Sequence, residues 1–348
     1  MLNIMKELLK KLSEAHGLSG REEGIRSIIR NEIESHVDEL YEDTMGNLVA
    51  VKKGNDFKVM LAAHMDEIGL MVKFIDEKGF IRFVTIGSFY APTLSAQRVV
   101  LPGSVGPVRG VIGGKPPHKM DDEERKKGVK IEDMFIDIGA STMEEVLALG
   151  IDIGTPITID RDFYELANGR VTGKAFDNRA GVAMLIEVMK RMETSNTVYA
   201  VFTVQEEVGL KGAKTSAYLI KPDCAIATDV TIPGDHPGIE KKDAPVEMGK
   251  GPVITIVDSS GRGLIADRRV VDWLKEAAKS IDIPFQLEVG SGGTTDATTI
   301  HLERGGIPST TVSIPTRYIH SPVEILELKD IDLAVKMIVE ALKTRPKI

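Results

Sequence analysis

The sequence has little cysteine, no excess of basic side chains and no long apolar segment. Its single cysteine, Cys224, excludes a disulfide framework within the chain, and a reducing, cytoplasmic location is therefore expected. The formal net charge of −8 argues against nucleic acid or an anionic membrane as the main partner. The first residues, MLNIMKELLKKLSEAHG, have apolar side chains at helical spacing but too many lysines for a signal sequence or a membrane span.

The composition is that of an ordinary soluble protein. Hydrophobic residues make up 42% and charged residues 28% of the 348 positions, which is enough for a sizeable core in two domains or one large one. Internal repeats and low-complexity tracts are not found, so the organisation follows from the order of the expected helices and strands.

The expected elements divide the chain into three segments. Residues 1–66 and 163–348 alternate helices with strands, which favours one α/β domain whose mixed, mainly parallel sheet is covered by helices on both faces. Residues 67–162 contain short strands separated by glycine and proline, which indicates a small β-barrel or sandwich. We therefore expect an all-β domain inserted into an α/β domain.

Two expected helices begin with a capping-box pattern. Ser19 is followed three residues later by Glu22, and Ser141 is followed by Glu144. Each serine is therefore predicted to cap the helix that comes after it.

Polar side chains lie at the ends of the expected α/β strands and at one helix start. The apolar segment VMLAAHMDEIG contains His64 and Asp66, which project to the same side of an extended chain because they are two residues apart. The other boundaries carry Asp177, Glu206, Glu207, Asp229 and His320. In an open α/β sheet, the carboxyl ends of parallel strands meet at one crevice.

Each of these positions has an ordinary explanation when it is taken alone. An HxD at a strand end can face water, a carboxylate before a helix is usually an N-cap, and adjacent glutamates are usually solvated. A lone histidine is more often a satisfied side chain than a ligand. Five boundaries that all carry His, Asp or Glu favour convergence on one site instead.

Two imidazoles and several carboxylates without cysteine form a donor set that suits zinc, cobalt or manganese. Five ligands are too many for one open tetrahedral site but suit two ions that share a carboxylate at roughly 3.5–4 Å. Two divalent cations would also offset the repulsion among so many acids.

The segments HMDEIG, AFDNRAG, VQEEVGLKGA, ATDV and RYIHSPVE, in this order, resemble the tetrahedral (TET-type) dinuclear metallo-aminopeptidases. That family includes glutamyl and leucyl aminopeptidases and relatives labelled endoglucanases. The resemblance covers essentially the whole chain and implies an α/β fold of the zinc-exopeptidase type with the inserted β domain. It also implies removal of N-terminal residues from short peptides, subunit pairing through residues 67–162, and a hollow tetrahedral dodecamer.

The metal ligands that the resemblance implies are five of the polar residues. One divalent ion, zinc or cobalt, would be bound by His64 and Asp229, and a second by Glu207 and His320. Asp177 would bridge the two ions.

The resemblance also implies catalytic roles for two further residues. Asp66 would orient His64, and Glu206 would act as the general base. Adjacent residues of a strand point to opposite faces, so the chain must turn at Glu206 and Glu207 for both to reach one site.

The glycine-rich segment VGSGGTTDATTI differs from a nucleotide-binding loop. It lacks the P-loop lysine and has Thr295 where a GxGxxG motif needs its last glycine. A strand-to-helix turn is the plain alternative. The resemblance implies that this segment lines the substrate pocket, with Gly292, Gly293 and Asp296 near the bound residue.

Other functions stay open as alternatives. An N-acyl-amino-acid amidohydrolase could use the same dinuclear site on blocked substrates. A glycoside hydrolase is less consistent, because its carboxylates must flank a bond at about 5–9.5 Å, and both histidines would lack a role. A non-catalytic metal-binding assembly module would not need Glu206. His118, in GGKPPHK, is expected in a surface loop of the inserted domain.

Overall fold

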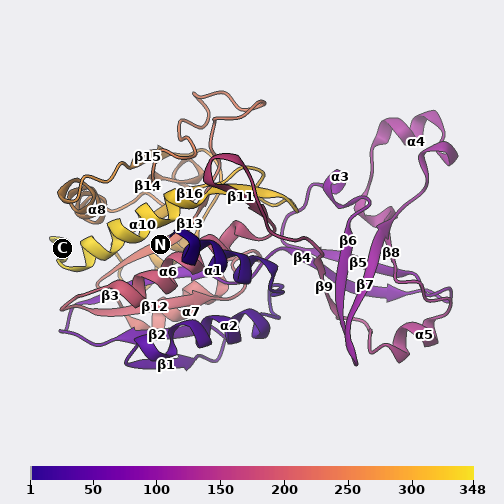
Figure 1. The fold of residues 1–348 in the computed structure, drawn as a ribbon, viewed down its shortest axis with the longest axis horizontal. Coiled ribbons are helices and arrows are strands. Elements are labelled where there is room, and N and C mark those ends of the chain that lie inside the picture. Colours follow the sequence, from indigo (N-terminus) through magenta and orange to yellow (C-terminus); the bar gives the residue numbers. More distant parts are fainter. Residues whose placement is uncertain (1) are drawn as a thin grey trace.

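The computed structural model describes residues 2–348 and consists of an α/β body and a β-barrel that projects from it (Figure 1). The chain leaves the body after β3 (Lys58–His64) and returns to it after β9 (Pro156–Ile159). The predicted fold class, an α/β domain with an inserted all-β domain, is therefore confirmed.

The body is built on an eight-stranded mixed sheet whose four central strands run parallel. From edge to edge the order is β1-β2-β12-β3-β13-β16-β14-β15. Thr203 of β12 pairs with His64 of β3, and Asp229 of β13 pairs with Ser313 of β16, so the carboxyl ends of these strands lie along one edge. The strands other than β3 are β1 (Glu39–Glu42), β2 (Leu48–Lys52), β12 (Thr197–Thr203), β13 (Cys224–Thr231), β14 (Val253–Val257), β15 (Gln286–Val289) and β16 (Ser309–Pro315).

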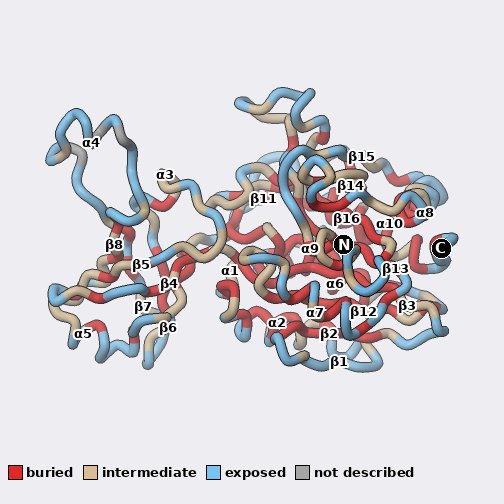
Figure 2. Tube along the Cα trace, turned by 180° about the vertical axis from the view of Figure 1, so that it is seen from behind, coloured by how far each residue is buried: buried red, intermediate tan, exposed pale blue. Residues whose placement is uncertain are grey.

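Helices cover both faces of this sheet because the strand residues alternate between two apolar clusters. Leu61 of β3 belongs to the larger cluster with α1, α2, α6, α8 and α10, whereas Met60 belongs to a smaller cluster with α7 and α9. Figure 2 shows buried chain running through the sheet. Among residues 2–348, none of the helices has the length and apolar character needed to cross a membrane. The helices are α1 (Leu2–Glu14), α2 (Glu23–Ile33), α6 (Phe176–Arg191), α7 (Lys211–Ile220), α8 (Arg268–Ser280), α9 (Asp296–Ile300) and α10 (Leu328–Leu342).

The projecting part is a closed six-stranded barrel with a core of its own. The strand order is β4-β5-β8-β7-β6-β9, and the interior is filled by apolar side chains such as Leu70, Ile81 and Ile136. Because the barrel is closed, none of these strands is an edge strand with unpaired backbone groups that could pair with another chain. The barrel comprises β4 (Gly69–Ile75), β5 (Ile81–Ile86), β6 (Arg98–Gly103), β7 (Gly106–Gly113), β8 (Phe135–Asp137) and β9, with α3 (Ala91–Leu94), α4 (Asp122–Lys127) and α5 (Met143–Ala148).

A three-stranded sheet and several short 3-10 helices complete the molecule. The sheet order is β10-β11-β17, so β17, close to the carboxyl end, is joined to strands that follow the barrel. These elements are β10 (Tyr164–Glu165), β11 (Arg170–Gly173), β17 (Glu324–Glu327), η1 (Glu34–His36), η2 (Pro117–Lys119), η3 (Ile131–Asp133), η4 (Ala167–Gly169) and η5 (Ser259–Gly261).

Both predicted capping boxes are wrong. The Ser19 hydroxyl donates instead to Asp66 at 2.6 Å, and α2 begins after Glu22 without a capping side chain. In the barrel, α5 is capped by Thr142 rather than by the serine before it. In a helix cap the serine oxygen would accept a backbone N–H, but the Ser19 hydroxyl instead donates to a buried carboxylate 47 residues away, which is a charged acceptor.

Candidate active site

The polar side chains predicted from strand and helix ends meet in one cavity at the carboxyl edge of the central strands. His64 is the last residue of β3, and Asp229 lies two residues before the end of β13. Segments beyond β12, beyond β16 and at the start of α6 also reach this cavity, whose volume is about 780 Å³. Six of the predicted residues line it: His64, Asp177, Glu206, Glu207, Asp229 and His320.

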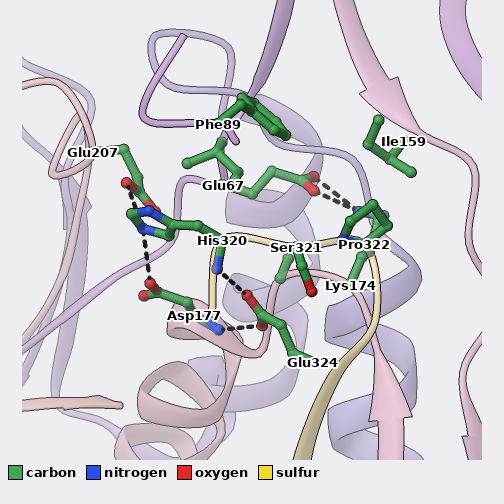
Figure 3. A pocket seen from close by; sticks show the side chains of 12 residues that line it. Glu67, Phe89, Ile159, Lys174, Asp177, Glu207, His320, Ser321, Pro322 and Glu324 are labelled. Atoms are coloured by element: carbon green, nitrogen blue, oxygen red, sulfur yellow. Dashed lines mark hydrogen bonds and ion pairs between the residues drawn. The ribbon is translucent and has the colours of Figure 1, made fainter. Parts of the chain in front are cut away.

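Asp177 lies between the two histidines. Its Oδ1 is 3.1 Å from Nε2 of His64, and its Oδ2 is 3.2 Å from Nε2 of His320. Figure 3 shows His320 between the carboxylates of Asp177 and Glu207, and the Glu207 Oε2 atom is 3.3 Å from Nε2. Each oxygen of Asp177 therefore faces a different imidazole, which is the arrangement that a bridging ligand requires.

Two more carboxylates lie on the His64 side. Asp229 Oδ1 is 4.0 Å and Glu206 Oε2 is 3.8 Å from Nε2 of His64. All three side chains are at most a tenth exposed. This side of the cavity therefore has one imidazole and two carboxylates in addition to Asp177.

Burial and neighbouring charges shift the pKa values of the groups around the cavity. Burial raises the pKa of Glu206 and of Asp229 well above the ordinary values, and neighbouring carboxylates add to this effect. Burial disfavours protonated His320, but Asp177 and Glu207 outweigh burial and raise its pKa to about 11. Among the lining residues, all within the described part of the chain, neither lysine nor arginine offsets these acids. A bound cation would favour the ionised form of these acids, so a cluster of this kind suits metal ions.

Asp66 connects His64 to the segment that carries both glutamates. The His64 Nδ1 atom is 3.2 Å from the Asp66 carbonyl oxygen and 3.5 Å from Oδ1, which leaves Nε2 directed toward the cavity. The backbone N–H groups of Glu206 and Glu207 donate to the Asp66 carboxylate. Because β12 ends before them and Gln205 has a φ of 56°, the chain turns here as expected, and both glutamates reach the cavity.

Glu324 is a site residue that was not predicted from the sequence. Its carboxylate accepts the backbone N–H of Asp177 at 2.9 Å and that of His320 at 3.1 Å, as Figure 3 shows. Glu324 is 2% exposed, and its two hydrogen bonds fix the segments of Asp177 and His320 relative to each other. Its position at the end of RYIHSPVE, four residues after His320, was the available signal.

The glycine-rich segment forms part of the cavity wall. Gly292 and Gly293 line it, and their contact with substrate stays a prediction. Asp296 does not line the cavity but lies behind it, where its carboxylate accepts the Thr203 hydroxyl at 2.5 Å. His118 lies in η2 of the barrel and is not among the residues that line the cavity.

The barrel closes one side of the site. A small cavity next to Asp177 is lined by Phe89, which follows β5, and by Ile159 of β9. Figure 3 also shows an ion pair in its wall, in which Lys174 Nζ is 2.7 Å from Glu67 Oε2. This small cavity therefore lies where the body meets the barrel.

The donor set fits divalent metal ions. Within residues 2–348, two groups have ligand atoms within 4.8 Å of one another: His64 with Asp177 and Glu207, and His64 with Glu206 and Asp229. The buried Glu207 Oε1 atom has no hydrogen-bond partner among the described residues, which is costly for a carboxylate oxygen unless a cation binds it. Imidazole and carboxylate ligands without thiolate suit zinc, cobalt or manganese.

The chain is similar in sequence and fold to several proteins named as aminopeptidases. The chain is 46% identical over 339 residues to a putative aminopeptidase of Acetivibrio thermocellus, covering 97% of this chain and 98% of the other. It is 45% identical to the solved aminopeptidase APDkam598 of Desulfurococcus kamchatkensis, with a TM-score of 0.94 over 99% of this chain and 96% of that one.

A third solved structure, the TET1 peptidase of Pyrococcus horikoshii, is 35% identical with a TM-score of 0.88 over 98% of this chain and 100% of that one. Residues 46–337 match the sequence model described as M42 glutamyl aminopeptidase. The chain therefore belongs to the M42 glutamyl aminopeptidase family.

Proposed function

We propose that this protein is a metal-dependent aminopeptidase that removes N-terminal residues from short peptides. The observation that carries the proposal is the position of Asp177, whose two oxygens face Nε2 atoms of two different histidines at 3.1 and 3.2 Å. In this proposal Asp177 bridges two divalent ions, zinc or cobalt. His64 and Asp229 hold one ion, and Glu207 and His320 hold the other.

The bound ions would lower the pKa of a water molecule and polarise the carbonyl of the scissile peptide bond. Glu206 would accept the proton of that water and deliver it to the leaving amine, a role typically worth about 10²–10⁴-fold in rate. Its carboxylate lines the cavity and lies next to His64. Asp66 would keep the His64 ring oriented and its Nδ1 protonated.

The cavity suits a substrate with a positively charged amino terminus. Beyond the proposed metal ligands, it is lined by the carboxylates of Asp258 and Glu288, and none of its described lining residues is a lysine or an arginine. A protonated or metal-bound α-amine would be stabilised there, whereas an acylated terminus would lose this attraction. Exopeptidase action on free termini follows from this charge distribution. Gly292 and Gly293 would let the substrate backbone approach the wall closely.

A pair of peptides tests the proposal against its main alternative, an N-acyl-amino-acid amidohydrolase. We expect a short peptide with a free amino terminus to be cleaved, and its N-acetylated form not to be. Chelation should abolish cleavage because the acids alone supply no Lewis acid, and added zinc or cobalt should restore it. Initial rates by mass spectrometry provide the measurement. Cleavage of the acetylated peptide alone would instead identify an amidohydrolase.

We also propose that residues 67–162, the inserted domain, pair subunits in the cytoplasm, and that the pairs assemble into a tetrahedral dodecamer. The relative from Pyrococcus horikoshii, the TET1 peptidase, can assemble into a tetrahedron or a large octahedral shell. On the barrel, Phe74 is 53% and Val84 39% exposed, and both line one surface hollow. Apolar side chains gathered in this way are typical of interfaces.

Sedimentation equilibrium measures the assembly directly. We expect a species of twelve 37.9 kDa subunits, with dimers as the main smaller form. Replacing Phe74 by aspartate would place a charge in the proposed contact and should shift the distribution toward smaller species. A wild-type protein that is only monomeric at micromolar concentration would refute the assembly.

A further inference from the structure

The loop between α1 and α2 reaches the active site from the amino-terminal part of the chain. It lies outside residues 46–337, the range that the family model covers. The Gly17 N–H donates to Glu67 Oε1 at 3.0 Å, and the Glu67 N–H donates to the Gly17 carbonyl at 2.9 Å. A side chain at Gly17 would lie 2.7 Å from Ile25 and 2.9 Å from Arg179, so the loop is closely packed. It is therefore held against Glu67, in the segment that follows His64.

Ser19 brings this loop into contact with Asp66. Its hydroxyl donates to Asp66 Oδ2 at 2.6 Å, and the serine is 6% exposed. The same carboxylate accepts the N–H of Glu206 at Oδ1 and the N–H of Glu207 at Oδ2. Three donors from two distant segments thus converge on one fully buried group. Removing the hydroxyl would free the carboxylate to rotate away from the glutamate amides.

Glu22 holds the same turn from its other side. Its Oε1 atom accepts the Gln205 N–H at 3.2 Å and the Gly20 N–H at 2.6 Å. The side chain is 3% exposed. Gln205 has a φ of 56°, a left-handed conformation that a residue with a side chain adopts only where the surroundings hold it. The hydrogen bond from its amide to Glu22 supplies part of that restraint.

The turn needs such restraint because Glu206 and Glu207 are adjacent but have different proposed tasks. Glu207 faces His320 at 3.3 Å, whereas Glu206 faces His64 at 3.8 Å. A small rotation of the turn would displace both carboxylates at once. Displacement of a reacting group by about 1 Å can cost roughly 100-fold in rate.

We propose that Ser19 and Glu22 are positioning residues, which fix the turn at Gln205 so that Glu206 faces the reacting water. Ser19 acts through Asp66, and Glu22 acts through the backbone amide of Gln205. The kinetic consequence rests on the proposed function of Glu206 as general base. The restraint of the turn at Gln205 does not depend on that function, and it can be measured in the absence of catalysis.

The kinetic test compares three substitutions at neighbouring positions. Glu22→Ala removes the acceptor, and we expect kcat to fall by about 10–100-fold with KM changed less than about threefold and metal content unchanged. Glu22→Gln keeps an oxygen that accepts both N–H groups and should recover most of kcat. Glu23→Ala removes an exposed acid from the first turn of α2 and should behave as the wild type. Equal kcat in Glu22→Ala and the wild type would overturn the positioning role.

Amide hydrogen exchange of the metal-free protein tests directly whether Ser19 and Glu22 restrain the turn at Gln205. In Glu22→Ala and in Ser19→Ala, a peptide spanning 204–210 should exchange about tenfold faster than in the wild type, while a peptide from β13 should not change. Glu22→Gln should keep the wild-type rate. If 204–210 exchanges at the wild-type rate in both alanine variants, the proposal is wrong. If the wild-type protein does not cleave peptides but the variants still show these exchange differences, the general-base role of Glu206 is refuted. The restraint of the turn at Gln205 by Ser19 and Glu22 is then still supported.

Discussion

Replacing Glu206 with glutamine is expected to lower kcat for peptide hydrolysis by about 10²–10⁴-fold, because the amide cannot accept the proton of the attacking water. The side chain keeps its size, and the backbone bond from its N–H to Asp66 is unaffected. Steady-state rates together with metal analysis provide the measurement. We expect the metal content per subunit to equal that of the wild type.

The metal content decides between two roles for Glu206. The distances from His64 Nε2 are similar for Glu206 Oε2, at 3.8 Å, and for Oδ1 of the proposed ligand Asp229, at 4.0 Å, so distance alone does not tell a base from a ligand. If Glu206→Gln loses a metal ion, Glu206 is a ligand rather than the base. If it keeps both ions and full kcat, Glu206 is neither. Glu23→Gln, which changes an exposed acid on α2, is the matched control and should not alter kcat.

Replacing Asp177 with asparagine should have the second large effect. Only one of the two atoms facing the histidines would then be an oxygen, and the amide NH₂ group would repel a cation. We expect metal content to fall to one ion or fewer per subunit. Activity should decrease by more than the 10–100-fold typical of groups that only support metal ligands. Metal titration by calorimetry and initial rates measure the two effects.

A matched control for this substitution is Asp272→Asn, on the exposed side of α8, which should bind metal as the wild type does. Retention of two ions and wild-type rates by Asp177→Asn would contradict the bridging role. Loss of stability without loss of metal would show that Asp177 mainly supports the start of α6.

The architecture could be predicted because its signals are local and repeated. The continuous apolar strand that ends at His64 is buried on both faces, and alternate residues such as Leu61 and Met60 face different helix layers. The convergence of the polar strand ends followed from the parallel arrangement of those strands. The edge strand β1 and the two-residue strand β10 are mostly exposed and lack any such apolar pattern.

The contacts that hold the site together could not be predicted, because they join segments far apart in the chain. The sequence around Ser19 matches a helix-capping pattern, and only the folded structure shows that its hydroxyl donates to Asp66 instead. Glu324 supports Asp177, 147 residues away, through a backbone amide that no side-chain pattern reveals. The left-handed conformation of Gln205 likewise depends on acceptors supplied by other segments.

Anomalous diffraction from crystals grown with zinc would test the proposed dinuclear site most directly. We predict two zinc ions per subunit, both bound by Asp177, with His64 on one and His320 on the other. A single ion, or ions bound away from Asp177, would contradict the dinuclear site.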